Sequence, residues 1–167
     1  MPVDPAGFRQ AMARFPGAVT IVTSLTPEGE RRGITATAVA SVTADPPSLL
    51  VCLNRKTGTC AAVAQTGRFV VNLLPGDGGD IALCFAGVGG ASGEAKFKVG
   101  DWREDEHGLP VLQGAVVSLS CTVSESLIAG THQVVIGQIT HIRVGAEVEA
   151  PAPLVYEQSR FHRLAPI

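Results

Sequence analysis

The segment VSLSCTVS, residues 117–124, decides the fold. Val117, Leu119, Cys121 and Val123 alternate with serine and threonine at every other position. Successive side chains of a β-strand point to opposite faces, so this period of two predicts a strand with one apolar and one polar face. Strands of that kind are typical of antiparallel sheets, in which one face packs on the core. We therefore expect an antiparallel β-structure around this segment.

The rest of the chain contains more segments typical of strands than of helices. Apolar or β-branched runs bounded by turn residues predict strands at residues 18–25, 33–42, 48–53, 69–74, 133–144 and 154–164. Short helices are predicted at residues 4–15, 59–65 and 81–86. No long helices alternate with the strands, as a parallel sheet would require. The sequence predicts a mainly β, antiparallel barrel with a few short helices, folded as one domain over residues 1–167.

Composition narrows the classes of function. The 13 Lys and Arg residues against 15 Asp and Glu give a net charge of −2, and only 5% of residues are aromatic, so no surface for nucleic acid is expected. No apolar run approaches the roughly 20 residues that span a membrane, and no secretory signal is visible. The cysteines and histidines have no metal-binding spacing. We expect a cytoplasmic protein with reduced cysteines and no metal site.

The common catalytic and nucleotide-binding signatures are absent from the sequence. The stretch Gly87-x-Gly89-x-x-Ser92 lacks the last glycine of a dinucleotide fingerprint and follows a helix-like segment rather than a strand. The chain has no phosphate-binding P-loop, no nucleophile elbow and no convincing pair of carboxylates.

Two polar segments at the ends of predicted strands are candidates for ligand binding. Thr35-Ala36-Thr37-Ala38 combines small side chains, which allow a flat ring to approach the backbone, with two hydroxyls. Residues 54–59, Asn-Arg-Lys-Thr-Gly-Thr, precede a predicted helix, where backbone amides, cations and hydroxyls suit a phosphate. Taken alone, the first segment is also typical of an ordinary strand, and the second of a charged loop.

The ordered set of segments resembles the flavin reductase family of FMN-binding split barrels. This family includes the small reductase components of two-component aromatic hydroxylases. The resemblance covers nearly the whole chain, and its specificity lies in the order of the motifs. The matching segments are Phe15–Thr23, Gly33–Ala38, Ser41–Pro47, Cys52–Thr57, Phe69–Leu74, Gly130-Thr131-His132, Leu154-Val155-Tyr156 and Arg160-Phe161.

The resemblance implies a six-stranded antiparallel Greek-key split barrel that forms a homodimer and binds FMN or FAD near the dimer interface. It also implies NADH or NADPH as hydride donor and a separate oxygenase that receives the reduced flavin. His132 would orient the nicotinamide, with Arg160 on the same side. The implied flavin contacts are Thr35, Ala36, Thr37 and Ala38 for the ring and ribityl chain, Asn54, Lys56 and Thr57 for the pyrimidine edge and phosphate, Asn72 close by, and Phe85 and Lys96 for the tail.

Two positions depart from the family pattern. Thr131 stands where the family often has an aspartate that would orient His132, and Ser159 stands where a glycine is often found. A hydroxyl orients an imidazole less strongly than a carboxylate does. Two alternatives to a flavin reductase therefore stay open: a flavin-binding dimeric module without turnover, and a flavoprotein with tightly bound FMN that reduces another acceptor.

Overall fold

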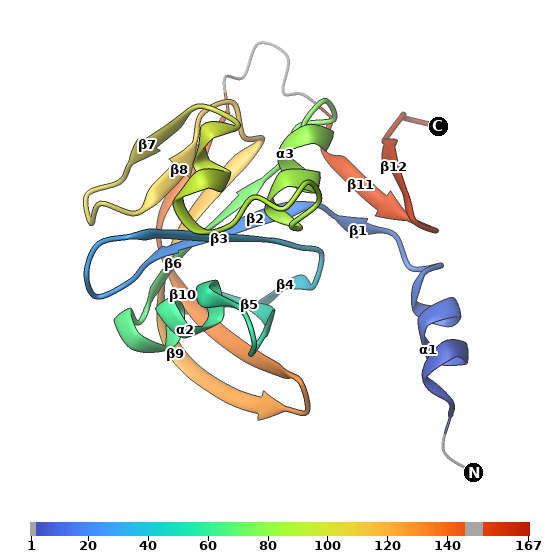
Figure 1. Cartoon of the computed structure of the whole chain (residues 1–167), viewed down its shortest axis with the longest axis horizontal. Helices are drawn as coiled ribbons and strands as arrows, with labels where there is room; N and C mark the ends of the chain where they lie inside the picture. The colour runs from blue at the N-terminus through green and yellow to red at the C-terminus, as the bar shows by residue number, and fades with distance from the viewer. Residues whose placement is uncertain (1–2, 146–151) are drawn as a thin grey trace.

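A computed structural model describes residues 3–145 and 152–167 (Figure 1). The described chain is mainly β, and every strand pair is antiparallel, which confirms the predicted fold class. The helices are α1 (Pro5–Met12), α2 (Gly58–Thr66), α3 (Gly79–Phe85) and the 3-10 helix η1 (Gly93–Lys98). The strands are β1 (Gly17–Ala18), β2 (Thr20–Leu25), β3 (Arg31–Ala36), β4 (Val39–Ala44), β5 (Pro47–Asn54), β6 (Arg68–Leu73), β7 (Trp102–Glu104), β8 (Pro110–Leu112), β9 (Val117–Ala129), β10 (His132–Val144), β11 (Leu154–Glu157) and β12 (Arg160–Arg163).

The main sheet contains seven strands in the order β3-β2-β6-β9-β10-β5-β4. Its centre is the hairpin of β9 and β10, each 13 residues long, so the alternating segment 117–124 does form a central strand. The seventh strand arises because residues 33–42, expected as one extended segment, are interrupted at Thr37 and Ala38. The interruption places β3 and β4 at opposite ends of the strand order.

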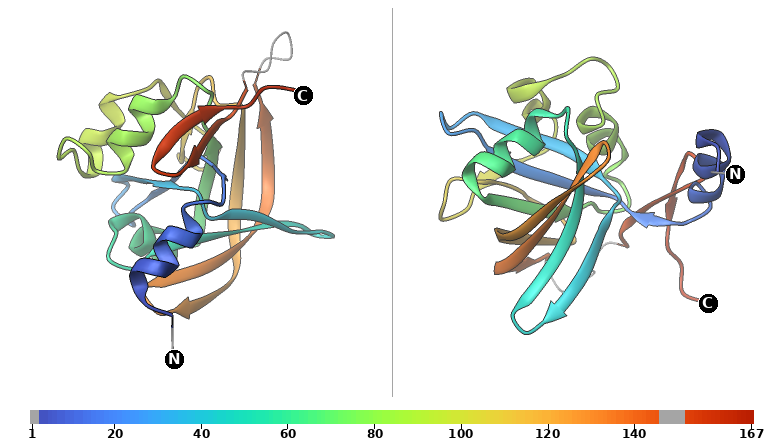
Figure 2. Two further views of the ribbon diagram at one scale, coloured as in Figure 1. Left: turned by 90° about the vertical axis from the view of Figure 1, so that its right-hand side faces the viewer. Right: turned by 90° about the horizontal axis from the view of Figure 1, so that it is seen from below.

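The short connection between β3 and β4 requires the sheet to close on itself. Thr37 and Ala38 alone join the two strands, and a connection of that length bridges at most about 11 Å. The edges of a flat sheet of seven strands would lie roughly 29 Å apart. The sheet therefore curls into a barrel, and no strand pairing joins β3 to β4 or β5 at the seam. Figures 1 and 2 show β3 passing close to the β4–β5 hairpin.

The described part of the molecule contains three apolar clusters, of which the smallest consists of Val70, Leu109 and Val111. The first lies inside the barrel and contains Val22, Val51, Phe69 and Val135, all at most 2% exposed. The second lies where α3 and η1 cover one end of β2 and β3, and its centre is a mutually packed set of Phe85, Phe97 and Trp102 with ring centroids 5.1–5.2 Å apart. Burial of these rings holds α3 and η1 against the edge strand β3.

The hairpin β7–β8 covers a polar face of the main sheet. Asn72 of β6 is 0% exposed and uses its whole amide group. Its Oδ1 accepts hydrogen bonds from the Leu112 amide (3.0 Å) and the Ser118 hydroxyl (2.8 Å), and its Nδ2 donates to the Ile21 carbonyl (3.1 Å). Nearby, the Asp105 carboxylate accepts from Ser120 Oγ at 2.9 Å. Because these groups satisfy each other, Ser118 and Ser120 on the polar side of β9 are buried, whereas Thr122 and Ser124 farther along the strand are exposed.

The three predicted helices form close to their expected positions. Asp4 caps α1 by accepting from the Ala6 and Gly7 amides at 2.9 Å, which also lowers the pKa of its carboxyl. Gly67 ends α2 with a φ of 69°, a left-handed conformation that favours glycine. In contrast to α2 and α3, α1 buries no residue and projects from the barrel (Figure 1). Among the described helices, none is long and apolar enough to cross a membrane.

Candidate functional site

The open seam of the barrel forms a groove, here called the seam groove. It has a volume of about 410 Å³ and brings together segments that are distant in sequence. One wall comes from β3 and the residues after it, the other from the end of β5, and the first residue of β10 lies beside them. The lining residues are Ile34, Thr35, Ala36, Thr37, Ala38, Cys52, Leu53, Asn54 and His132. Thr35–Ala38, Asn54 and His132 were all predicted from the sequence as site residues.

The backbone of β3 supplies polar groups to this groove. β3 is an edge strand that pairs with β2 on one side only. In an antiparallel strand, every second residue directs its N–H and C=O away from the paired neighbour. The side chains there are small or short, so a planar ring can approach these groups closely. The seam groove therefore suits a flat heteroaromatic ring with donors and acceptors on its edge.

A second pocket, here called the cationic pocket, continues the groove at Ile34. It has a volume of about 530 Å³ and includes Arg32, Thr57, Lys96 and residues of the glycine-rich loop. Thr57 Oγ1 accepts from the Cys60 amide at 3.2 Å and so caps α2, whose N-terminus faces this pocket. Lys96 beside a helix N-terminus is a typical environment for a phosphate group, and Arg32, which also forms an ion pair with the Glu30 carboxylate, adds a second cation.

Lys96 is held in place by two backbone carbonyls. Its Nζ donates to the Phe85 carbonyl at 2.8 Å and to the Gly33 carbonyl at 3.2 Å. Burial lowers the pKa of Lys96 from its ordinary value of 10.5, and Cys84 acts in the opposite direction. Gly33 is essential to this packing because a Cβ there would lie 2.5 Å from the Phe85 ring. The ammonium group is thus positioned beside the edge of β3 by the aromatic cluster under α3.

An apolar pocket adjoins the seam groove on the other side of β3. It has a volume of about 300 Å³ and shares Thr35 and Thr37 with the groove. Tyr156 and Phe161, from β11 and β12, form a tilted pair in its wall with ring centroids 5.4 Å apart. The Thr35 hydroxyl donates to the Ala82 carbonyl at 2.6 Å, whereas no hydrogen bond of the Thr37 hydroxyl is found among the described residues. Thr37 is therefore the hydroxyl available to a ligand.

His132 lies at the open end of the seam groove. It begins β10 and pairs with Asn54 of β5. Its Nδ1 is 2.9 Å from the Thr131 hydroxyl, so Thr131 contacts the same ring nitrogen that a carboxylate would orient. Arg55 fixes the preceding turn by donating from its backbone amide to the Thr131 carbonyl at 3.1 Å. The imidazole is exposed and faces the groove from the β10 side.

Four predicted site residues have other positions. Asn72 and Phe85 are 0% exposed, so the expected side-chain contacts with flavin are not supported. The Asn72 amide forms hydrogen bonds beneath β7–β8. The Phe85 ring packs in the aromatic cluster. Lys56 is exposed and lines none of these three pockets. Arg160 is also exposed and lines none of them, although its neighbour Phe161 lines the apolar pocket.

The structure adds residues that the sequence did not identify as site residues. Arg32 reaches the cationic pocket, Cys52 lines the seam groove, and Tyr156 and Phe161 line the apolar pocket. Arg32 could have been found from its position on the same strand, because alternate residues of a strand share a face. It alternates with Ile34 and Ala36, which line the seam groove. Cys52 precedes Asn54 by two positions on β5 and could have been found in the same way.

Comparison with known proteins agrees with this arrangement. The family described as "Flavin reductase like domain" matches residues 12–165. The chain is 43% identical over 157 residues to the 4-hydroxyphenylacetate 3-monooxygenase reductase component of Pseudomonas aeruginosa, covering 94% of this chain and 90% of that protein. It is 38% identical over 162 residues to the FMN reductase (NADH) RutF of Pseudomonas syringae, covering 97% and 88%.

A solved structure has the same fold. The NADH:FAD oxidoreductase SgcE6 of Streptomyces globisporus superimposes with a TM-score of 0.85 at 27% identity, covering 100% of this chain and 93% of that one. The family match spans nearly the whole chain, and the similarity to the P. aeruginosa protein extends over most of both sequences. The resemblance inferred from the ordered motifs is thereby confirmed, and the chain belongs to the flavin reductase like domain family.

Proposed function

We propose that this protein is an NAD(P)H:flavin oxidoreductase that reduces FMN or FAD, with residues 1–167 acting as one flavin reductase domain. The observation that carries the proposal is that the seam groove and the cationic pocket lie next to each other and share Ile34. A flat polar ring on one side and a phosphate on the other match the two ends of a flavin nucleotide. The names of the relatives, FMN reductase and NADH:FAD oxidoreductase, support the same activity.

In this proposal, the flavin ring lies against the edge of β3. Backbone groups between Ile34 and Ala38 bind its polar edge, with the Thr37 hydroxyl and the Asn54 side chain beside them. The flavin phosphate lies in the cationic pocket, where Lys96, Arg32 and the Thr57 end of α2 offset its charge. Reduction places negative charge near flavin N1, which donors fixed on the edge strand stabilise without reorganisation.

The nicotinamide lies on the open side of the seam groove, and His132 orients it. The hydride passes from nicotinamide C4 to flavin N5, and a proton from solvent completes the reduction, so NAD(P)H, flavin and a proton yield NAD(P)⁺ and reduced flavin. The protein contributes the stacking of the two rings, with no acid–base residue required. Thr131, in hydrogen-bond contact with His132 Nδ1, takes the orienting part that an aspartate has in many members of the family.

Reduced flavin leaves for a separate oxygenase. The seam groove opens at the surface and Thr37 and Ala38 are exposed, which favours exchange of flavin over permanent retention. Relatives named as reductase components of monooxygenases support this role. The flavin is then a substrate, and binding is reversible.

A second copy of the chain covers the projecting helix. Phe8, Met12 and Phe15 are 59%, 47% and 67% exposed, and α1 buries no residue within its own chain. Apolar side chains on a helix with no packing partner favour association with another surface. A homodimer provides that surface, and a measured mass of one chain in light scattering would contradict it.

The experiment is to measure NADH and NADPH oxidation with and without FMN, FAD and riboflavin. Oxidation that saturates with added flavin supports the reductase and identifies the preferred nucleotide and flavin. Flavin binding without oxidation favours the dimeric module without turnover. Flavin that survives extensive dialysis favours the flavoprotein that reduces another acceptor.

A further inference from the structure

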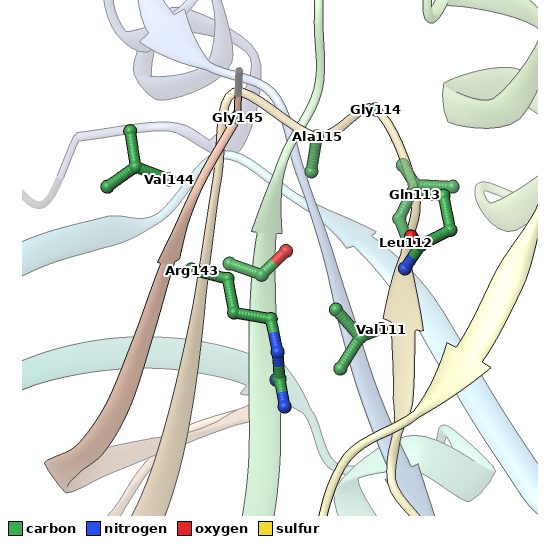
Figure 3. Close-up of a pocket in the computed structure, with 9 residues that line it drawn as sticks. Val111, Leu112, Gln113, Gly114, Ala115, Arg143, Val144 and Gly145 are labelled. Atoms are coloured by element: carbon green, nitrogen blue, oxygen red, sulfur yellow. The ribbon is translucent and has the colours of Figure 1, made fainter. Parts of the chain in front are cut away.

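A separate pocket lies on the side of the barrel covered by the β7–β8 hairpin. It has a volume of about 340 Å³ and lies between the end of β8 and the neighbouring ends of β9 and β10 (Figure 3). It shares no residue with the seam groove, the cationic pocket or the apolar pocket. Its lining consists of Val111, Leu112, Gln113, Gly114, Ala115, Ser118, Arg143, Val144 and Gly145. We call it the Arg143 pocket.

Arg143 is the charged group of this pocket. It pairs with Ser118 across the β9–β10 hairpin, and its guanidinium points along the strands toward Val111 (Figure 3). Its Nη1 atom is buried and has no hydrogen-bond partner within the described part of the chain. None of the ion pairs between described residues includes it. An arginine stays charged, and a buried donor without a partner is costly.

The neighbouring acceptors are already occupied. Asn72 Oδ1 accepts from the Leu112 amide and the Ser118 hydroxyl. The Asp105 carboxylate accepts from the His107 and Leu109 amides, each at 2.9 Å, and from Ser120 Oγ. The polar network under the hairpin is therefore complete without Arg143. The guanidinium is left facing a pocket rather than an acceptor of the fold.

The shape and polarity of the pocket restrict what would bind. Val111 and Ala115 supply apolar wall beside a single cation, whereas the Val144 side chain points away from Arg143 (Figure 3). A Cβ at Gly145 would lie 2.8 Å from the Ala115 carbonyl, so the absence of a side chain allows the residue after β10 to lie against the connection between β8 and β9. One guanidinium balances one negative charge, and its planar fork matches two oxygens of a carboxylate. A phosphate dianion would require a second cation, which the lining does not contain.

We propose that the Arg143 pocket binds a small organic carboxylate. The carboxylate accepts hydrogen bonds from the guanidinium of Arg143, and its apolar body lies against Val111 and Ala115. The site is independent of the flavin groove, so this proposal goes beyond the reductase activity and does not depend on it.

Sodium benzoate is a suitable probe, and benzamide is its neutral counterpart of the same shape. We expect benzoate to shift the backbone amide signals of Gly114 and Ser118 in a saturable way in an NMR titration of the flavin-free full chain. Benzamide and inorganic phosphate should bind at least about tenfold more weakly, because neither offers a singly charged planar acceptor. Equal binding of benzoate and benzamide, or no saturable shift with benzoate, would overturn the proposal.

Variants localise the effect. Arg143→Gln should weaken benzoate binding by about tenfold or more, and Arg143→Lys by less, because the ammonium keeps the charge and loses the fork. Arg68→Gln, at an exposed arginine of β6, is the control and should bind benzoate as the unaltered protein does. Flavin reduction should be unchanged in all three. Unaltered benzoate binding by Arg143→Gln would contradict the assignment.

A further pair of variants tests whether the chain supplies its own carboxylate. Glu147 and Glu149 follow in the sequence, outside the described residues. If Glu147→Gln or Glu149→Gln lowers the melting temperature as much as Arg143→Gln does, and the combined variants add nothing, the partner of Arg143 is intramolecular and the ligand site is rejected. Unchanged benzoate binding and melting temperature in both variants support the site.

Discussion

Two polar regions of the barrel use the same kinds of side chain for different purposes. At the seam, Thr37 and Asn54 lie beside an unpaired strand edge. Under the β7–β8 hairpin, Asn72 and Ser118 lie on paired strands and bond to each other. Asn54 uses its Oδ1 only for the Lys56 amide nearby (3.0 Å), whereas Asn72 bonds to groups from β2, β8 and β9. The first region is open to a ligand and the second stabilises the fold.

This difference shows what makes an amide or hydroxyl a binding group. Its residue type is less informative than whether the fold has already used its hydrogen bonds. A buried, satisfied group stabilises the fold, and its removal leaves its partners without acceptors. A group at an unpaired edge exchanges water for a ligand and affects stability little. The predictions below test this contrast.

The largest effect is expected at Asn72. Asn72→Ala removes the acceptor of the Leu112 amide and the Ser118 hydroxyl, so the free energy of unfolding should fall by roughly 3 kcal/mol. Asn54→Ala should lower it by under about 1 kcal/mol and should weaken flavin binding instead. Denaturant unfolding and flavin titration of both variants provide the measurement. Equal losses of stability would show that the two regions do not differ as described.

His132 tests the nicotinamide side of the seam. His132→Ala should slow NADH-dependent turnover by about tenfold or more, because the nicotinamide loses its orienting group. The dissociation constant of flavin should stay nearly unchanged. His141→Ala, at an exposed histidine farther along β10, is the control. A parallel loss of turnover and flavin affinity in His132→Ala would argue against a role in orienting nicotinamide.

Lys96 tests the phosphate end. Lys96→Gln should weaken FMN binding by about tenfold and leave riboflavin binding nearly unchanged, because only FMN has the phosphate. The same charge predicts a pH dependence. Burial lowers the pKa of Lys96 below 10.5, so FMN affinity should fall as the pH rises through that lowered pKa and the ammonium loses its proton. Lys98→Gln, at an exposed lysine of η1, is the control and should bind FMN as the unaltered protein does. If Lys96→Gln bound riboflavin more weakly as well, the variant would be misfolded rather than lacking a phosphate contact.

The two threonines of the seam form a matched pair. Thr35→Val removes the hydrogen bond to the Ala82 carbonyl and should lower the free energy of unfolding by about 1 kcal/mol. Thr37→Val should leave stability unchanged and weaken flavin binding by about fivefold. Thermal unfolding and flavin fluorescence quenching distinguish the two outcomes. An unchanged flavin affinity in Thr37→Val would remove this hydroxyl from the proposed site.

The smallest effect is expected at Ser159, away from both regions. Ser159 has a φ of 62° between β11 and β12, a conformation that favours glycine. Ser159→Gly should raise the free energy of unfolding by about 0.5 kcal/mol, since relief of strain slightly exceeds the added entropy of the unfolded chain. A melting temperature that falls would mean that the serine is better accommodated than its φ indicates.

The sequence by itself determined most strands, the three short helices and the family, but it did not predict β7 and β8, and the expected strands 33–42 and 154–164 each form two strands. Alternation at residues 117–124, proline and glycine at the ends of segments, and the order of the motifs are local properties, and local backbone preferences do not depend on distant contacts. The same local reading also singled out Thr35–Ala38 and Asn54, because the site is built from strand ends, whereas His132 was indicated by the family resemblance.

Only the tertiary structure decided which polar residues are available. Asn72 lies inside the predicted strand 69–74 and Asn54 just after the predicted strand 48–53, but the sequence does not show which of the two amides has its hydrogen bonds used by the fold. The closure of the sheet leaves Asn54 at the unpaired seam, whereas the β7–β8 hairpin covers Asn72. Three other features also follow from the closed barrel rather than from local sequence. They are the interruption at Thr37-Ala38, the approach of Lys96 to Gly33, and the guanidinium of Arg143 without a partner among the described residues. Each depends on contacts between segments distant in sequence, which fix burial and hydrogen bonding only after the barrel has closed.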